Sequence, residues 1–568
     1  MDQEAAYRNR WRILGVLVVS LLVVVLDNSI LNVALPAISR ELEATQSQLI
    51  WAVDSYALVF ASLLFTWGVM GDRYGRRRVL LIGLTLFGVA SALTAYSSSA
   101  EMLIVNRALM GIGGAAVLPV TLAIITNVFP PKERPKAIGI WAGAVGVAIA
   151  LGPITGGFLL EHFWWGSVFL INVPVVVAGV AGILALVPES RAGTASKLDP
   201  VGVVLSIAGL MLLVYGIVHG GETNDWSLPT VWGPLLGGIV ILTVFVLVEL
   251  RSDHPSFDIH LFSNREFSVS LAAVTLVFFG LMGATFFLVF YLQTVRGLTP
   301  FQAGLALLPL AAGQMVSATR SAHTTRLFGP KLVIGTGLLL VSVVFVVMLM
   351  VTATTPMWII LVLYLALGVG MGNAMAPATA TMMSTLPLAR AGAGSAVQNT
   401  VRQVGGALGV AILGTVISVV YGHRFDSLVP NLPSAAQPAT TSVEAAHNVA
   451  SGALAAGVIT PDQANALIDA ANSSFITAMH VATIFTAAAA LLGAVIAYVG
   501  LPRKAEHEEL LHSKTASFNE QVAEASATRT GSSAPAAAQV EPATRAAADA
   551  MPDPLPDPLP DPVPEAGS

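Results

Sequence analysis

Cysteine is absent from the 568-residue sequence, and charged residues make up only 11% of it. Without cysteine the chain can form no disulfide and no thiolate metal site. A soluble domain carries about 25% charged residues, so this chain has too few to cover a water-exposed surface of its size. The net charge of −5 is accompanied by no basic stripe, which argues against a nucleic-acid interface.

Other functional signatures are missing as well. No His-x-x-x-His pair suggests a metal site, and no Walker-type phosphate loop suggests ATP-driven transport. No nucleophile and general base stand in a defensible arrangement. We therefore expect no metal, no cofactor and no enzymatic activity.

Apolar residues make up 55% of the chain and occur in long blocks. Blocks of about 20 apolar residues match a bilayer, and in lipid they must be helices to satisfy their own backbone hydrogen bonds. We predict an all-α integral membrane protein with fourteen spans. The spans are 13–37, 49–70, 79–97, 102–128, 136–160, 166–188, 201–220, 230–250, 267–294, 302–322, 332–352, 357–383, 393–421 and 475–500.

The distribution of Lys and Arg orients these spans. If the N-terminus is cytoplasmic, nineteen fall inside and only Arg40, Arg296 and Arg424 fall outside. The nineteen lie within 8–12, 73–78, 132–136, 191–197, 251–265, 326–331, 390 and 503–504. Positive charge accumulates on the cytoplasmic side of membrane proteins. We therefore predict a multi-pass protein of the cytoplasmic membrane with both termini inside.

Short echoes suggest that the chain is duplicated. The glycines at 111–114 precede Pro119 in the fourth span, and those at 368–372 precede Pro377 in the twelfth. Paired bundles with a substrate site between them are a common transporter design. We expect a cytoplasmic N-terminus (1–12), a first six-helix bundle (13–188), two inserted helices with loops (189–266), a second bundle (267–500) and a disordered cytoplasmic tail (501–568).

The longest external loop is predicted at 422–473. Thr460 followed by Pro461 is typical of a capped helix start, so we expect a helical hairpin there. The Pro-Asp-Pro-Leu repeats of the tail favour an extended or disordered chain.

Three charged residues fall well inside the apolar spans of the first bundle: Asp27, Asp54 and Arg107. All three should lie in the outer half of the membrane at comparable depth. A charge there is costly and needs a cavity or a partner. An aspartate balanced between desolvation and a nearby arginine can load and release a proton. The alternative is a static Asp–Arg pair that only fixes helix packing.

The second bundle contains amides and one arginine where the first has acids. Arg402 lies near the middle of the thirteenth span and either lines the cavity, binds an anionic group, or is neutralised by the helix itself. The residues that we expect to line a central cavity are Asn28, Asn32, Tyr56, Gln314, Gln398, Asn399, Arg402 and Gln403.

A basic loop and a glycine-rich helix have candidate conformational roles. The loop contains Gly68, Asp72, Arg73, Gly75, Arg76 and Arg77. It serves either as a topology anchor or as an ion network that locks a cytoplasmic gate. The fifth span contains Gly152, Pro153, Gly156 and Gly157. Small residues let helices approach closely and proline bends them, which suits either packing or alternating access.

Several of these motifs together resemble the major facilitator superfamily, in its fourteen-segment drug:proton antiporter branch. They are the loop from Gly68 to Arg77, Arg107-x-x-Met110-Gly111-x-Gly113, Gly152-Pro153-x-x-Gly156-Gly157, Asp27 before Asn32-Val33-Ala34-Leu35-Pro36, and Phe169-Leu170-Ile171-Asn172-Val173-Pro174. The resemblance covers residues 11–505. It implies proton-coupled efflux of amphipathic drugs by alternating access, conferring antibiotic resistance.

The chain also departs from that branch. Multidrug exporters of this kind carry acidic residues in the tenth and thirteenth helices, where this sequence has Gln314, Asn399 and Gln403. A neutral, monocationic or partly anionic amphipathic substrate is therefore expected rather than a divalent cation. The expected partners are that substrate, protons and lipid, and the chain is expected to be a monomer. The alternatives are a narrow-range exporter of one metabolite or self-made antibiotic, and a membrane receptor or scaffold.

Overall fold

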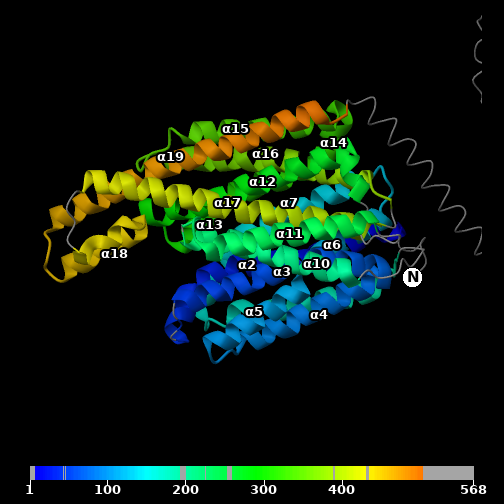
Figure 1. Cartoon of the computed structure of the whole chain (residues 1–568), viewed down its shortest axis with the longest axis horizontal. Coiled ribbons are helices and arrows are strands. Elements are labelled where there is room, and N and C mark those ends of the chain that lie inside the picture. Colours follow the sequence, from blue (N-terminus) through cyan, green and yellow to red (C-terminus); the bar gives the residue numbers. More distant parts are fainter. Residues whose placement is uncertain are drawn as a thin grey trace, which may run out of the picture. The chain divides into compact units, whose positions relative to one another are not determined.

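The computed structural model describes residues 7–42, 44, 46–191, 200–223, 225–251, 259–387, 390–429 and 434–502. Every regular element in these ranges is a helix (Figure 1). The predicted tail lies outside the described residues from 503 onward, and so do the side chains of Asn32 and Pro153.

The first bundle contains six membrane segments. Its helices are α2 (Arg10–Glu41), α3 (Gln46–Tyr74), α4 (Arg76–Ala95), α5 (Ala100–Gly114), α6 (Val117–Val128), α7 (Arg134–His162), α8 (Ser167–Leu170) and α9 (Asn172–Leu186). Helix α5 packs on α3 and α4, and α2 packs on α7 and α9. The fold thus brings the first, fifth and sixth segments side by side.

The second bundle has six further segments. Its helices are α12 (Arg265–Phe290) with the π-helical turn η2 (Tyr291–Val295), α13 (Pro300–Ala306), α14 (Leu308–Phe328), α15 (Pro330–Met348), α16 (Met357–Ser384), α17 (Ala391–Leu428) and α19 (Pro461–Gly500). Helix α14 packs on α16, and α12 packs on α17 and α19. Across the bundles, α7 packs on α14 and α17 packs on α3 and α6.

Two predicted spans are interrupted in the structure. The fourth span breaks between α5 and α6, and Pro119 lies in the first turn of α6; the tenth span breaks at Leu307, with Pro309 in the first turn of α14. Proline is tolerated in the first turn because its missing N–H has no intrahelical acceptor there. Each pair of helices still forms one membrane segment, 100–128 and 301–328, so the predicted spans 102–128 and 302–322 are confirmed.

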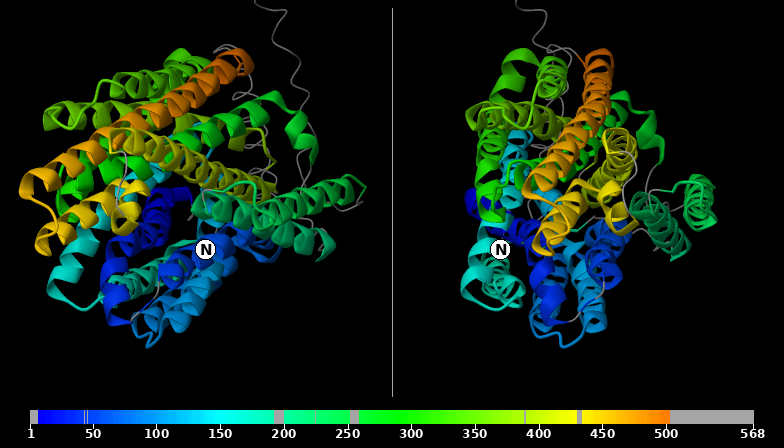
Figure 2. Two further views of the ribbon diagram at one scale, coloured as in Figure 1. Left: turned by 60° about the vertical axis from the view of Figure 1, so that its left-hand side comes forward. Right: turned by 90° about the vertical axis from the view of Figure 1, so that its left-hand side faces the viewer.

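The inserted segments are α10 (Pro200–Thr223) and α11 (Pro229–Arg251), followed by the short helix η1 (Ile259–Ser263). Helix α10 packs on α3 of the first bundle and on α17 of the second. Helix α11 packs mainly on α10, and Figure 2 shows the pair at the edge of the helix packing. One inserted helix therefore touches both bundles.

A helical hairpin is present within 422–473, as predicted. Helix α18 (Val443–Ala455) follows the short helix η4 (Ser434–Thr440) and packs on α19. Helix α19 begins at Pro461, where Thr460 and Gln463 form a capping box. The last helix therefore starts well before the predicted residue 475 and forms one arm of the hairpin.

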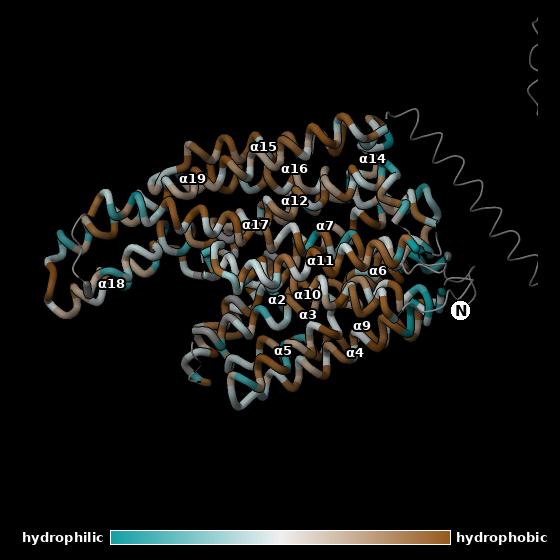
Figure 3. The backbone as a smooth tube through the Cα atoms, viewed as in Figure 1, coloured by the Kyte–Doolittle hydropathy of each residue, from teal (hydrophilic) through white to brown (hydrophobic). Residues whose placement is uncertain are grey.

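Thirteen of the described helical segments are long and apolar enough to cross a membrane. Helix α7, with 29 residues, covers the remaining predicted span, 136–160. Figure 3 shows apolar residues along most of their length, while hydrophilic residues gather toward the helix ends near the N-terminus and along α18. The structure agrees with the predicted fourteen-helix architecture of two bundles and two inserted helices.

Candidate transport site

A buried ion pair joins two helices of the first bundle. Arg107 of α5 donates from Nη1 to Asp27 Oδ2 of α2 at 2.6 Å, and both side chains are fully buried. Arg107 also donates from Nε to the carbonyl oxygen of Ala52 at 3.1 Å. The ring of Tyr56 lies 4.3 Å from the guanidinium carbon, within the range of a cation–π contact. Tyr56 therefore packs on this pair rather than lining the cavity.

A second donor reaches Asp27 from the sixth segment. Asn172, the first residue of α9, donates from Nδ2 to Asp27 Oδ1 at 2.7 Å and to Ser91 Oγ at 3.0 Å. Ser91 in turn donates to the carbonyl oxygen of Phe169 at 2.9 Å. Sequence reasoning noticed Asn172 only as part of a motif and missed Ser91. A polar residue at a helix break within an apolar span is the signal that points to Asn172.

A cavity of about 540 Å³ lies between the bundles and α10. Its polar lining includes Asn28 of α2, Asp54 of α3 and Gln403 of α17, while α10 and α12 contribute apolar side chains. It extends to residues 441–443 immediately before and at the start of α18. Asp54 therefore faces open space, whereas Asp27, one residue before Asn28, is enclosed.

The amides predicted at the cavity divide into two groups. Asn28 and Gln403 line it, whereas Gln314, Gln398 and Asn399 are buried in the second bundle outside its lining. Gln398 donates to Thr379 Oγ1 at 2.5 Å and Asn399 donates to the carbonyl oxygen of Ser395 at 2.8 Å. In this conformation Gln398 therefore connects α17 to α16, and Asn399 bonds within α17.

The bundles meet tightly at the end that holds the basic loop. Asp72 of α3 pairs with Arg76 at 2.7 Å. It also accepts from the backbone N–H groups of Gly392 and Ala393, both at 3.0 Å. These two residues lie in the first turn of α17. The N-terminus of a helix favours a negative charge. The carboxylate therefore joins the first bundle to the second.

Glycine is required for this approach. A Cβ on Gly68 would lie about 2.5 Å from both Ala396 Cβ and the carbonyl oxygen of Gly392, so any larger residue would push α3 away from α17. Nearby, Gly75 has φ of 112°, a left-handed conformation that glycine adopts without strain. Ser395 adds a hydrogen bond to the carbonyl oxygen of Pro119 at 2.7 Å. The closed end is thus held by backbone contacts as well as by charge.

The other predicted arginines of the loop make further contacts. Arg77 donates to the carbonyl oxygen of Leu184 at 2.8 Å, and its backbone N–H donates to Glu189 at 3.1 Å. Arg73 lies over the ring of Tyr74 at 5.4 Å. Of the predicted gating residues, the structure therefore brings Gly68, Asp72 and Arg76 to the bundle interface.

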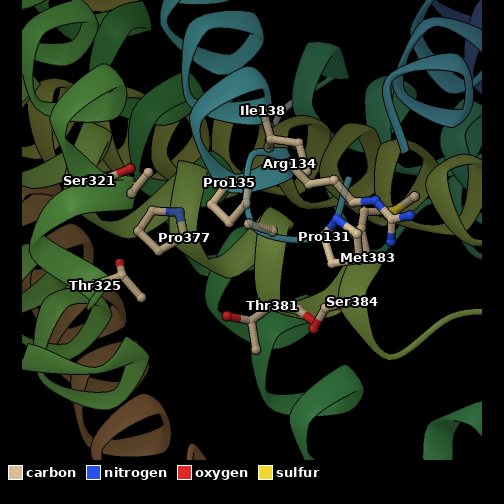
Figure 4. Close-up of a pocket in the computed structure, with 12 residues that line it drawn as sticks. Pro131, Arg134, Pro135, Ile138, Ser321, Thr325, Pro377, Thr381, Met383 and Ser384 are labelled. Carbon is tan, nitrogen blue, oxygen red and sulfur yellow. The ribbon is translucent and has the colours of Figure 1, made fainter. Parts of the chain in front are cut away.

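A small pocket of about 40 Å³ adjoins the closed end, between the start of α7, α14 and the end of α16. Figure 4 shows Pro135 and Pro377 close together beside it, with Ser321 and Thr325 on α14. Its volume is less than a tenth of that of the central cavity.

The glycines of α7 allow it to pack on both bundles. A Cβ on Gly139 or Gly146 would collide with Ala318 or Gln314 of α14. A Cβ on Gly152 would collide with Ser29 of α2, and one on Gly156 would touch Ile30 at 3.4 Å. Gly157 has no such constraint, because its nearest neighbour, Phe301, is 3.9 Å away. Helix α7 therefore contacts α14 with its first half and α2 with its second.

The Major Facilitator Superfamily model matches residues 17–410. The chain belongs to this superfamily. It is 36% identical to the "Multidrug efflux pump LfrA" of Mycolicibacterium smegmatis, over 85% of this chain and 95% of that protein. It is 34% identical to the "Tetracenomycin C resistance and export protein" of Streptomyces glaucescens, over 88% of this chain and 93% of that protein.

Solved structures agree on the fold of the transporter. The proton:xylose symporter XylE superimposes with a TM-score of 0.56 at 12% identity, covering 87% of this chain and 96% of that chain. The human organic anion transporter MFSD10 gives 0.55 at 14% identity, covering 86% and 99%. At such low identity the likeness concerns the fold alone.

Proposed function

We propose that this transporter exports amphipathic drugs or other toxic small molecules across the bacterial cytoplasmic membrane in exchange for protons. The named efflux and export relatives support this substrate class. The observation that carries the proton coupling is the position of Asp27, which is fully buried, ion-paired and adjacent to cavity-lining Asn28. A carboxylate enclosed beside a cavity can exchange a proton when neighbouring helices move.

The two ends of the bundle interface differ in a way that fits alternating access. The end with the basic loop is closed by the contact between Asp72 of α3 and the start of α17. The cavity extends toward α18 at the other end. With positive charge inside, this conformation faces outward. Opening inward requires α3 to leave the N-terminus of α17, which breaks the two backbone hydrogen bonds of Asp72. Both bundles and the whole cavity belong to one chain, so we expect a monomer.

In this mechanism Arg107 and Asn172 stabilise the charged form of Asp27. Protonation neutralises Asp27 and removes its attraction to Arg107, so helices α2, α5 and α9 lose a contact that ties them together. Asp54 lines the cavity, where it can attract a cationic group of a substrate.

Inverted membrane vesicles test the coupling. Adding a transported compound should disturb an imposed pH gradient in vesicles with the wild-type protein, and Asp27→Asn should abolish the response. Asp469→Asn is the matched control, because Asp469 is exposed in α19. Continued exchange by Asp27→Asn would remove Asp27 from the coupling mechanism.

A narrow-range exporter is the second candidate, favoured by the relative named for one antibiotic. The two are separated by growth of an efflux-deficient host that expresses the chain, challenged with many dyes and antibiotics. Resistance to several unrelated compounds supports the broad exporter, and resistance to one supports the narrow exporter.

A further inference from the structure

Arg402 lies near the centre of the membrane, at the inner end of the cavity. It follows the start of α17 by eleven residues, which is about 16 Å along the helix and about half of a 30 Å hydrocarbon core. Its side chain is buried, with 4% exposure. Gln403, the next residue, and Gly406, one turn further along, both line the cavity. Arg402 is therefore a neighbour, along α17, of residues that line the cavity, although it is not itself part of the lining.

The membrane segments of the second bundle contain no acidic residue that could compensate this charge. The sequence has no Asp or Glu from 267 to 425 or from 470 to 500, which covers the membrane segments of the second bundle. Within the described part of the chain, Arg402 Nε and Nη1 have no hydrogen-bond partner. An intramembrane arginine normally pairs with an acid or a carbonyl, and an ionisable residue there is by default a functional candidate.

Two aromatic rings cover the guanidinium instead. The ring of Phe278, from α12, lies 4.7 Å from its central carbon, and the ring of Trp141, from α7, lies 5.9 Å away. Met282, one turn beyond Phe278, lines the cavity. The two rings belong to different bundles, so they separate when the bundles rock. Opening toward the cytoplasm would then uncover a free cation between two aromatic faces.

We propose that Arg402, with Phe278 and Trp141, forms a subsite for a carboxylate or ionised phenol on an aromatic substrate. The anionic oxygen accepts from the unpartnered guanidinium N–H groups, and the planar ring of the substrate packs on the aromatic faces. This proposal rests on the proposed export function and adds the charge class of the substrate. In the outward conformation Trp141 takes the place of the substrate against the cation, which favours release.

Rhodamine B and its ethyl ester test the subsite, because they share one ring system and differ only in a free carboxylate. Binding to the purified full chain is measured by fluorescence anisotropy, and transport is measured separately in proteoliposomes with a pH gradient. The wild-type protein should bind the acid more tightly than the ester. Arg402→Gln should weaken binding of the acid about tenfold or more, as expected for a hydrogen bond to a charged group, and change binding of the ester less than about twofold.

Two variants exclude a folding defect. Arg402→Lys keeps the charge and should restore part of the preference for the acid. Arg424→Gln removes an exposed arginine from the outer end of the same helix and should change neither dye. An equal loss of both dyes in Arg402→Gln, or no loss of either, would overturn the subsite.

The outcomes also separate the subsite from the export function. Acid-selective binding without pH-driven transport would leave the subsite standing and overturn the exporter. Binding and transport of the ester without preference for the acid would leave the exporter standing and overturn the subsite. Binding of neither dye would overturn the subsite, while transport of other compounds would continue to support export.

Discussion

The two bundles share a fold but differ in how their buried charged residues are paired. In the first, each of two buried carboxylates has an arginine partner, Asp27 with Arg107 and Asp72 with Arg76. In the second, Arg402 has no acidic partner among the described residues, and α17 carries the amides Gln398, Asn399 and Gln403 beside it. A compensated pair is suited to hold and release a proton, whereas an uncompensated cation is suited to meet a ligand. The difference suggests that the halves of a duplicated fold have divided these tasks.

The largest expected effect compares the two buried arginines. Arg107→Met leaves Asp27 buried without its partner and should destabilise the protein by roughly 3–5 kcal/mol. Arg402→Met removes a cation that has no acid beside it and should be neutral or stabilising. Thermal unfolding in detergent checks both, and the double variant Asp27→Asn/Arg107→Met should recover part of the loss. Equal destabilisation by the two single variants would contradict the distinction between a paired Arg107 and an unpaired Arg402.

A smaller effect compares one amide from each bundle. Asn172→Leu removes a donor to the charged Asp27, which should cost about 1.5–3 kcal/mol. Asn399→Leu removes a neutral hydrogen bond to the carbonyl of Ser395, which should cost about 1 kcal/mol. The same unfolding assay measures both variants, together with pH-driven transport. If Asn399→Leu proved the more damaging, the second bundle would depend on its amides more than its contacts suggest.

The smallest effect concerns the contact that joins the bundles. Asp72→Asn weakens the interaction with the N-terminus of α17, which is typically worth about 0.3–1 kcal/mol, so inward opening should rise roughly two- to fivefold. Because the chain has no cysteine, Ser321→Cys is a single reporter, buried beside the small pocket at the closed end. Its labelling by a maleimide should accelerate in Asp72→Asn. An unchanged labelling rate would show that backbone contacts alone keep this end closed.

The sequence predicts the architecture well, because lipid demands long apolar helices and positive charge marks one side. It also places Asp27 and Arg107 at similar depth, and Thr460 at a helix start. It does not reveal that Asn172 and Ser91 complete the contacts of Asp27, since these come from segments distant in the chain. Nor does it separate Gln403, which faces the cavity, from Gln398, which does not. Helix rotation decides that difference, and rotation depends on packing against neighbouring helices.

Helices α17 and α19 contain 38 and 40 residues, which corresponds to nearly 60 Å each, about twice the hydrocarbon thickness. Part of each must therefore stand clear of the lipid, and α18 packs on the projecting end of α19. A membrane protein of this size usually offers little outside the detergent belt for particle alignment in electron cryomicroscopy. This helical protrusion gives an antibody fragment a folded epitope, and a bound fragment would act as a fiducial for imaging both conformations.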